Sequence, residues 1–392
     1  KNHKYVSIPY THLEECDSKG WTACTEACPR SVAPNLITLF AMFNGFICFG
    51  LMWYYSPSYS ETPPFWVYYV CALCIWFYQT LDAMDGKQAR RTGAGSPLGQ
   101  LFDHGCDACV TICLHAVAVG IFTPGPNNWT VALQMSTQLV FFLSQWNEYT
   151  THVLTIAVGP KGKTPWFGVV EVQYIIIVGC LIWGTMTIFG FDIFRLCVAP
   201  WEAELTGAEC SLRVTDLFSM GWCALLTGPA AIWALVTTCK HENAQGQRAE
   251  MFKQLVPVLI VFVLSFCWPP QTLAANAHAI VLSSGTYTCS QKAVPALGPL
   301  LPISNPLLHS CVGLFVNLMT NTMIVCSMSR QKFPVWQWLF IPYVAALIIC
   351  NVFEYTQPLS MERCLVIFCT VSIYWRSWPR ACCCMVRINT VD

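Results

Sequence analysis

The sequence predicts an all-α polytopic membrane protein with about ten transmembrane helices, and three observations support this prediction. Of the 392 residues, 55% are hydrophobic and only 11% are charged, with a mean hydropathy of +0.48. Soluble domains carry about 25% charged residues. Apolar stretches long enough to cross a bilayer recur along the chain. The Lys and Arg residues between them fall mainly on one side of the predicted membrane.

The ten predicted spans set the expected organisation of the chain. They are 36–55, 65–82, 104–123, 129–146, 167–190, 214–239, 254–271, 306–327, 334–353 and 361–378. An even number of spans places both flanking segments on the same side. We therefore expect an N-terminal segment (1–35), a transmembrane domain (36–378) and a tail (379–392). Residues 1–30 are polar and lack an apolar core, so we expect no cleavable signal and a retained first span.

The distribution of basic residues gives the expected orientation. With ten spans, 17 of the 21 Lys and Arg residues fall on the side of the N-terminal segment, and the other four are Arg195, Arg213, Lys292 and Arg363. Cytoplasmic loops carry an excess of Lys and Arg. The asymmetry therefore predicts that the segment before the first span, and the loop between the second and third spans, face the cytosol.

Composition also limits the other classes of function. The net charge is zero, which argues against a nucleic-acid partner. The 24 cysteines lie scattered through apolar runs, where cysteine behaves as a small hydrophobic residue. The sequence leaves open whether Cys197, Cys210 and Cys289 pair in a lumen, whether Asn128 is glycosylated, and whether the cysteines at 382–384 are palmitoylated.

The stretch 81–107 carries the chemistry. Its sequence, LDAMDGKQARRTGAGSPLGQLFDHGCD, holds two pairs of carboxylates: Asp82 with Asp85, and Asp103 with Asp107. Spacings of three and four place each pair on one face of a helix. Gly93, Gly95 and Pro97 lie between the pairs, and Ser96-Pro97 is typical of a helix start. Two helices can therefore meet with all four carboxylates converging, and such an oxygen-only set suits Mg²⁺ or Mn²⁺.

The basic residues of the same stretch allow two interpretations. Lys87, Arg90 and Arg91 can neutralise the carboxylates directly, which would make the cluster a purely structural one. Alternatively, a cation such as Arg90 can form a two-pronged contact with a phosphate group of a substrate. The ordered spacing of the carboxylates favours a metal and a phosphate-bearing substrate. Gly86 and Gly99 let a ligand or a neighbouring helix approach the backbone closely.

These residues match a known pattern. The arrangement D-x2-D-G-x2-A-R-x8-G-x3-D-x3-D is satisfied at eight positions, namely Asp82, Asp85, Gly86, Ala89, Arg90, Gly99, Asp103 and Asp107. It is similar to the signature of the CDP-alcohol phosphotransferase family. Together with APNLIT at 33–38 and EVQ at 171–173, the stretch resembles the eukaryotic choline/ethanolamine phosphotransferases. The resemblance is strong over about residues 30–175 and rests on the helix pattern beyond.

The resemblance implies a reaction in which diacylglycerol and CDP-choline or CDP-ethanolamine give phosphatidylcholine or phosphatidylethanolamine and CMP. It implies two divalent ions, held by Asp82, Asp85, Asp103 and Asp107. It also implies a CDP-alcohol pocket, with contributions from Gly86, Arg90 and Gly99 and weaker ones from Asn35 and Lys87. Membership of this kind further implies a homodimer in the endoplasmic reticulum or Golgi membrane, with the site facing the cytosol.

The hydroxyl of diacylglycerol needs a base, because an alcohol is a poor nucleophile at neutral pH. His104 follows a metal ligand and lies about 100° around the helix from it, so it can face the substrate. Glu171 lies in an apolar run, where an acid needs a partner, and the relatives suggest that it orients His104. Asp107 is the alternative base.

Three questions stay open at this stage. The acceptor in place of diacylglycerol can be inositol, serine or glycerol phosphate within the same family, and an ion carrier is an alternative of a different class. Choline and ethanolamine are not distinguished either. An aromatic cage would favour choline, and Tyr78, Trp146 and Tyr149 are the available side chains.

Overall fold

The computed structural model describes residues 10–56, 59, 61–122, 128–154, 157–159, 164–191, 198, 214–266, 305–338 and 340–352. Several predictions lie outside these residues. They are the tenth span (361–378), the tail (379–392), and the predictions for Cys197, Cys210, Cys289 and the cysteines at 382–384.

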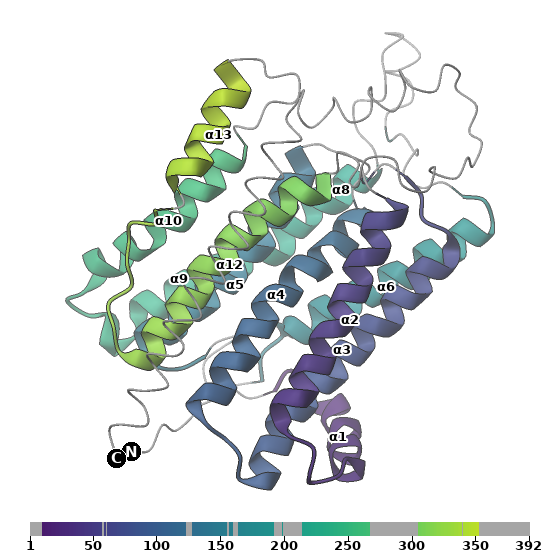
Figure 1. The fold of residues 1–392 in the computed structure, drawn as a ribbon, viewed down its shortest axis with the longest axis horizontal. Coiled ribbons are helices and arrows are strands. Elements are labelled where there is room, and N and C mark those ends of the chain that lie inside the picture. Colours follow the sequence, from purple (N-terminus) through teal and green to yellow (C-terminus); the bar gives the residue numbers. More distant parts are fainter. Residues whose placement is uncertain are drawn as a thin grey trace.

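The described chain is almost entirely helical (Figure 1). In order, the elements are α1 (His12–Ala27), α2 (Pro34–Tyr55), α3 (Phe65–Thr92), α4 (Pro97–Phe122), α5 (Asn128–Thr151), β1 (Ala157–Val158), β2 (Phe167–Gly168), α6 (Val169–Ile188), α8 (Val214–Gly221), the π-helical turn η2 (Trp222–Thr227), α9 (Gly228–Lys240), the 3₁₀ turn η3 (Glu242–Ala244), α10 (Arg248–Ser265), α12 (Asn305–Ser329) and α13 (Phe340–Val352). The two short strands pair antiparallel, with Ala157 opposite Gly168.

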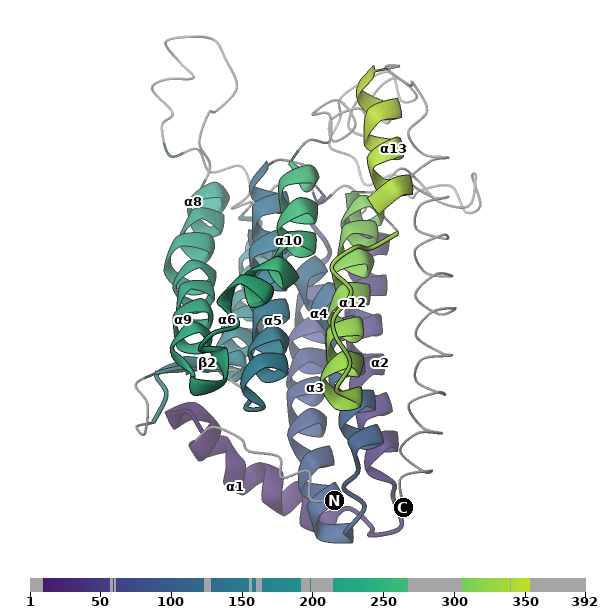
Figure 2. The ribbon, with the colours of Figure 1, turned by 90° about the vertical axis from the view of Figure 1, so that its left-hand side faces the viewer.

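Two apolar clusters hold the long helices together. One joins α2, α3, α4 and α6 through residues such as Tyr68, Ile75 and Val117. The other joins α5, α9, α10, α12 and α13 around Trp146 and Phe315. Helices α4 and α5 run next to each other, so they form the boundary between the two clusters (Figures 1 and 2).

Five helical segments in the described part are long and apolar enough to cross a membrane. They are 34–55, 97–121, 169–188, 214–240 and 312–329. The outer face of α2 exposes Phe40, Phe43 and Ile47 at helical spacing, as expected where a helix faces lipid. The chain is therefore an integral membrane protein, and the total of ten spans stays a prediction.

Several helices differ in length from the apolar runs that predicted them. Helix α3 continues ten residues past the predicted end of its span, and α10 begins at Arg248, six residues early. Hydropathy reports the thickness of the apolar layer, whereas a helix continues through polar residues until a cap or a turn ends it. In α13 the difference is the reverse, because residues 331–338, including Pro334, are not helical and the helix begins at Phe340.

Helix α1 was not predicted, and it crosses the end of the bundle obliquely and contacts the last part of α3 (Figure 2). Thr11 and Glu14 form a reciprocal capping box at its start, in which Thr11 Oγ1 accepts from the Glu14 N–H and Glu14 Oε2 accepts from the Thr11 N–H. The T-x-x-E spacing is visible in the sequence and would have located this helix.

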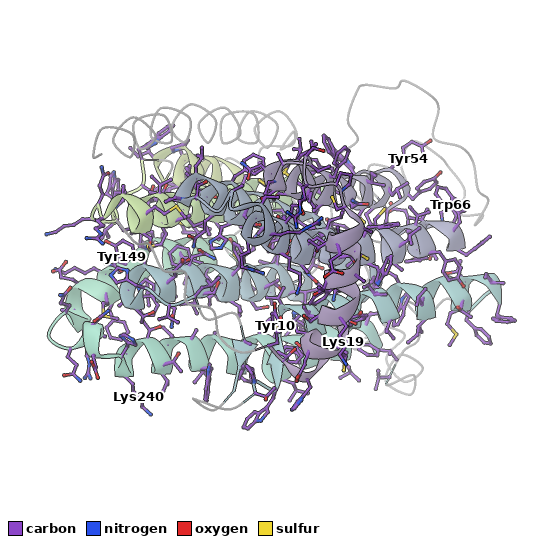
Figure 3. All side chains as sticks on the ribbon, turned by 90° about the horizontal axis from the view of Figure 1, so that it is seen from below. Tyr10, Lys19, Tyr54, Trp66, Tyr149 and Lys240 are labelled. Carbon is purple, nitrogen blue, oxygen red and sulfur yellow. The ribbon has the colours of Figure 1, made fainter. Side chains whose placement is uncertain are left out.

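The side-chain view shows which parts of the chain share an end of the bundle (Figure 3). Tyr54 and Trp66 lie at one end, and Tyr149 and Lys240 lie at the other. This arrangement agrees with the predicted alternation of the spans, in which residues 54 and 66 lie across the membrane from residues 149 and 240.

Candidate metal centre

The local sequence explains how α3 and α4 come together. Helix α3 ends at Gly93, which adopts a left-handed conformation (φ 66°) that favours glycine. After a short loop, Ser96 Oγ accepts a hydrogen bond of 3.1 Å from the Gly99 N–H, and Pro97 opens α4. The turn therefore returns the chain antiparallel to α3, so that the carboxylates at the end of α3 face those at the start of α4.

The four predicted carboxylates converge. Oxygen atoms of Asp82, Asp85 and Asp103 lie within 4.8 Å of one another. Asp107 completes the group, because its carboxylate contacts that of Asp82 while Asp85 contacts Asp103. The group draws on α3 and α4 alone, as the sequence predicted, and Asp85 is buried.

Two neutral donors hold the group from the side. Tyr78 donates a hydrogen bond of 2.9 Å from its hydroxyl to Asp107 Oδ1, and Thr38 of α2 donates to Asp85 Oδ2. Both side chains are buried. The sequence analysis did not assign these two roles. The APNLIT segment contains Thr38, and Tyr78 lies four residues before Asp82, so the pattern held signals for both residues.

The cluster fits a hard divalent cation. The Oδ1 atom of Asp103 is buried without a hydrogen-bond partner among the described residues, which is costly unless another charge or donor satisfies it. Within the same part of the chain no Lys or Arg forms an ion pair with any of the four carboxylates. The purely structural interpretation required such pairs. An all-oxygen set with this much uncompensated charge is the type that Mg²⁺ and Mn²⁺ occupy.

Lys87 and Arg91 serve the packing of α1. The Lys87 ammonium donates to Ser18 Oγ and Thr22 Oγ1, both at 3.1 Å. Arg91 donates to the Thr25 carbonyl and, at 3.0 Å, to that of Cys28. Lys87 was expected to be a weak substrate contact, but in this structure it ties α3 to α1.

Arg90 differs from its two basic neighbours. It is exposed, and the described residues offer its guanidinium no hydrogen bond or ion pair. It lies over Gly86, where an added Cβ would be 3.5 Å from Arg90 Nη1. An added Cβ at Gly99 would lie 3.6 Å from Asn35 Oδ1. The predicted pocket residues therefore lie in two neighbouring pairs, Gly86 with Arg90 and Gly99 with Asn35.

His104 is buried at the start of α4, but its acidic neighbour is not the predicted one. Its Nδ1 lies 3.7 Å from Glu148 Oε2, which comes from α5. The imidazole also lies near Asp107. The sequence analysis missed Glu148 because it lies just beyond the predicted span 129–146 and has no spacing relation to the aspartates.

Glu171 is engaged at the start of α6. Its Oε2 accepts a hydrogen bond of 2.7 Å from the Gly168 N–H, which caps the helix. It also adjoins Glu14 of α1. Burial raises the pKa of the Glu14 carboxyl, the Thr11 N–H opposes this, and the negative charge of Glu171 raises that pKa further. The sequence analysis expected Glu171 to pair with His104, whereas its hydrogen bond in the structure is with Gly168.

The three aromatic candidates for a choline cage have other partners. Tyr78 binds Asp107, as described above. Trp146 is fully buried and donates from Nε1 to Gln254 Oε1 at 3.0 Å, and Tyr149 donates to the Gln331 carbonyl at 3.1 Å. None of them is arranged around a free pocket beside the carboxylates, so they give no basis for choosing between choline and ethanolamine.

Comparison with known proteins covers the part of the chain that holds the cluster. The family model of CDP-alcohol phosphatidyltransferase matches residues 31–195, which include all four carboxylates. A Dictyostelium discoideum protein described as an uncharacterized CDP-alcohol phosphatidyltransferase class-I family protein is 38% identical over 346 residues, covering 87% of this chain and 77% of its own.

Relatives with more specific names match less of the chain. Choline/ethanolaminephosphotransferase 2 of Arabidopsis thaliana is 30% identical over 293 residues, or 73% of this chain and 72% of its own. Cholinephosphotransferase 1 of Rattus norvegicus is 36% identical over 157 residues, or 39% of each chain. The chain also spans only about half (48%) of another Dictyostelium relative, to which it is 38% identical.

Proposed function

Because the chain belongs to the CDP-alcohol phosphatidyltransferase family, we propose that it transfers phosphocholine or phosphoethanolamine from a CDP-alcohol to diacylglycerol. The observation that carries this proposal is the convergence of four carboxylates from α3 and α4, which no basic side chain among the described residues neutralises. The names of the Arabidopsis and rat relatives support the choice of head group.

Each residue of the site has a chemical task in this proposal. Asp82, Asp85, Asp103 and Asp107 would hold two divalent ions, Mg²⁺ or Mn²⁺, which supply positive charge to the diphosphate and to the leaving CMP. The unengaged guanidinium of Arg90 binds phosphate oxygens of the CDP-alcohol. Gly86 and Gly99 keep the backbone open on both sides, and Asn35 beside Gly99 offers an amide to the nucleotide.

The bond changes are those of an in-line displacement. The acceptor hydroxyl oxygen forms a bond to the phosphorus that carries the head group, and the bond from this phosphorus to the bridging oxygen breaks. CMP leaves with that oxygen. The proton of the hydroxyl passes to His104, which is buried one residue from Asp103; Asp107 is the alternative acceptor of this proton.

The position of the site suits substrates of opposite solubility. Asp82 and Asp85 follow the apolar part of α3, and Asp103 and Asp107 lie in the first turns of α4. A water-soluble CDP-alcohol can approach from the loop at 93–96, and a lipid acceptor from the bilayer. We propose that this face is cytosolic, in the endoplasmic reticulum or Golgi membrane, and that the protein acts as a homodimer.

The proposal is tested by following CMP release from the purified protein in lipid vesicles. With diacylglycerol, Mn²⁺ or Mg²⁺, and either CDP-choline or CDP-ethanolamine, we expect CMP and the matching phospholipid. Asp103→Asn should reduce the rate at least about 10²-fold, because it removes a ligand charge at the reacting phosphate. The matched control is Glu250→Gln, which alters an exposed carboxylate paired with Lys253.

Two results would contradict the proposal. Release of CMP only when CDP-diacylglycerol is supplied with inositol, serine or glycerol phosphate would assign the other acceptor class. No release from any CDP-alcohol, by a folded protein that binds Mn²⁺, would favour the non-enzymatic class. Competition between CDP-choline and CDP-ethanolamine in the same vesicles ranks the two head groups.

A further inference from the structure

A seam of amide side chains runs from the carboxylate cluster into the apolar part of the bundle, where α4, α5 and α12 pack against one another (Figures 1 and 2). Asn321 Oδ1 lies 3.5 Å from the position of an added Cβ at Gly105. One turn back along α12, Asn317 donates a hydrogen bond of 3.4 Å to Cys109 Sγ. Gly105 and Cys109 flank Asp107 on α4, so the seam begins at the candidate metal centre.

A small cavity lies on this seam. Its volume is about 10 Å³, which is room for about one water-sized polar group. Each of the three helices contributes a polar side chain to it, Thr111 from α4, Gln138 from α5 and Asn317 from α12. Thr111 follows Asp107 by one helical turn, or about 6 Å along the axis. The cavity therefore lies about one turn deeper in the bundle than the carboxylates.

Gln138 has hydrogen-bonding capacity that the described residues do not use. Its side chain is buried, with 4% exposed, and its Oε1 has no hydrogen-bond partner among them. Gln138 lies within the predicted span 129–146, where an unpaired amide group is costly because the bilayer offers it no partner. Gly313 leaves room for this amide, since an added Cβ there would be 2.8 Å from Gln138 Nε2.

The position of the cavity suits part of the lipid acceptor. The free hydroxyl of diacylglycerol has to reach the carboxylates, and the ester carbonyls lie a few bonds from that hydroxyl. This separation is similar to one helical turn, roughly 6 Å, on the side from which the acyl chains extend into the bilayer. An ester carbonyl only accepts hydrogen bonds, and a glutamine amide can turn its NH₂ group toward such an acceptor.

We propose that this cavity is the subsite for an ester carbonyl of the lipid acceptor, and that Gln138 recognises the carbonyl. The Nε2 of Gln138 donates a hydrogen bond to it, which holds the glycerol backbone with its free hydroxyl at the metal centre. An alkyl-linked glycerolipid has no carbonyl oxygen, so Gln138 distinguishes it from an acyl-linked one. This inference rests on the proposed function and deepens it, because it assigns a residue that selects the acceptor.

Paired acceptors test the inference. CMP release is measured in lipid vesicles with diacylglycerol and with a dialkylglycerol of the same chain length, in which ether links replace the esters. We expect the wild type to favour the diacyl acceptor about 10-fold in kcat/KM, as the loss of one buried hydrogen bond predicts. In Gln138→Leu the preference should fall to about twofold or less, because only the diacyl acceptor loses a contact.

Gln145→Leu is the matched control. Gln145 also lies on α5, is 4% exposed and has an Oε1 without a hydrogen-bond partner in the described part of the chain, but it does not line the cavity. Its replacement should change the rates with the two acceptors by the same factor. If Gln138→Leu folds poorly, Gly313→Ala takes its place. The added Cβ displaces the Gln138 amide, and the preference should narrow in the same way.

Two kinetic results would overturn the inference. Equal kcat/KM values of the wild type for the diacyl and dialkyl acceptors would show that no carbonyl is recognised. Equal losses with both acceptors in Gln138→Leu, together with a lower thermal unfolding temperature, would instead assign the cavity to a structural water and Gln138 to helix packing.

Lipid binding separates the inference from the proposed function. Native mass spectrometry of the purified protein compares the diacylglycerol and dialkylglycerol retained from an equal mixture and needs no turnover. We expect the wild type, but not Gln138→Leu, to retain mainly diacylglycerol. Equal retention of the two lipids by the wild type would overturn the inference. Wild-type protein that shows the preference but releases no CMP from any CDP-alcohol would contradict the proposed function alone.

Discussion

At the residue scale, the carboxylates depend on uncharged neighbours as much as on one another. Thr38 and Tyr78 each donate a hydrogen bond to a different carboxylate of the cluster. Donors of this type orient metal ligands and commonly change metal affinity 10- to 100-fold when removed, a rough range across metalloproteins. We therefore regard both as part of the candidate metal centre.

Removal of the Tyr78 hydroxyl should weaken the metal site specifically. Tyr78→Phe keeps the ring in the core but leaves Asp107 Oδ1 without its 2.9 Å hydrogen bond. We expect the Mn²⁺ concentration for half-maximal CMP release to rise about 10-fold. The matched control is Tyr69→Phe. Tyr69 also lies on α3, but its hydroxyl contacts Thr185 of α6, away from the cluster. An unchanged Mn²⁺ dependence would show that this hydroxyl has no part in the site.

At the element scale, α3 serves two purposes along its 28 residues. Its first part packs among the apolar residues of α2 and α6, and its last part carries carboxylates on one face and basic residues that reach α1 on another. Helix α1 is in turn fixed at its own start by a capping box and at its side by Lys87. The docking of α1 and the metal centre therefore share one helix.

Loss of the Lys87 contacts should loosen α1. Lys87→Met removes two hydrogen bonds from a charged donor, together worth about 1 kcal/mol at this partly exposed position. Lys19 is exposed on α1 (Figure 3). We expect trypsin to cleave after Lys19 roughly fivefold faster in this variant, because cleavage follows local opening.

Lys240→Met, at the end of α9, is the matched control and should leave the cleavage rate at Lys19 unchanged. An equal rate in Lys87→Met and the wild type would contradict the role assigned to Lys87. If Lys87→Met instead raises the KM for the CDP-alcohol without faster cleavage at Lys19, Lys87 contacts the substrate, as the sequence analysis expected.

At the scale of the whole molecule, the carboxylate cluster lies on α3 and α4, and α4 also borders the second apolar cluster through α5. The four carboxylates converge and have no basic partner in the described part of the chain, so they repel one another in this position. A bound cation therefore adds to the stability of the folded bundle as well as to the chemistry.

Metal removal should lower the thermal unfolding temperature of the protein in detergent. A ligand at 100 times its Kd stabilises a fold by about 2.7 kcal/mol, so we expect chelation by EDTA to lower the midpoint by several degrees and Mn²⁺ to restore it. In Asp103→Asn the shift caused by EDTA should be smaller, because one ligand is missing. A wild-type midpoint that ignores EDTA would contradict the assignment of a metal centre.

Some features followed from local spacing, and others did not. The separations of three and four residues placed Asp82, Asp85, Asp103 and Asp107 on matching helix faces, and the structure brings them together. The capping box at Thr11 is equally local and marks the start of α1, but the sequence analysis did not predict this helix. The apolar surroundings of Glu171 indicated that it needs a partner and the resemblance suggested His104, but in the structure Glu171 accepts a hydrogen bond from the Gly168 N–H at the start of α6.

The sequence alone determined the membrane character, the turn between α3 and α4 and the identity of the carboxylates, because these depend on composition and on contacts within a few turns of helix. Only the tertiary structure decided which of three basic residues is unengaged, and which acid stands beside His104. Those answers depend on how α1 packs on α3 and α5 on α4, and helix spacing carries no information about contacts between residues 44 or more positions apart. The stretch from Asp82 to Asp107 thus supplies the candidate ligands, and the helices packed around it determine their contacts.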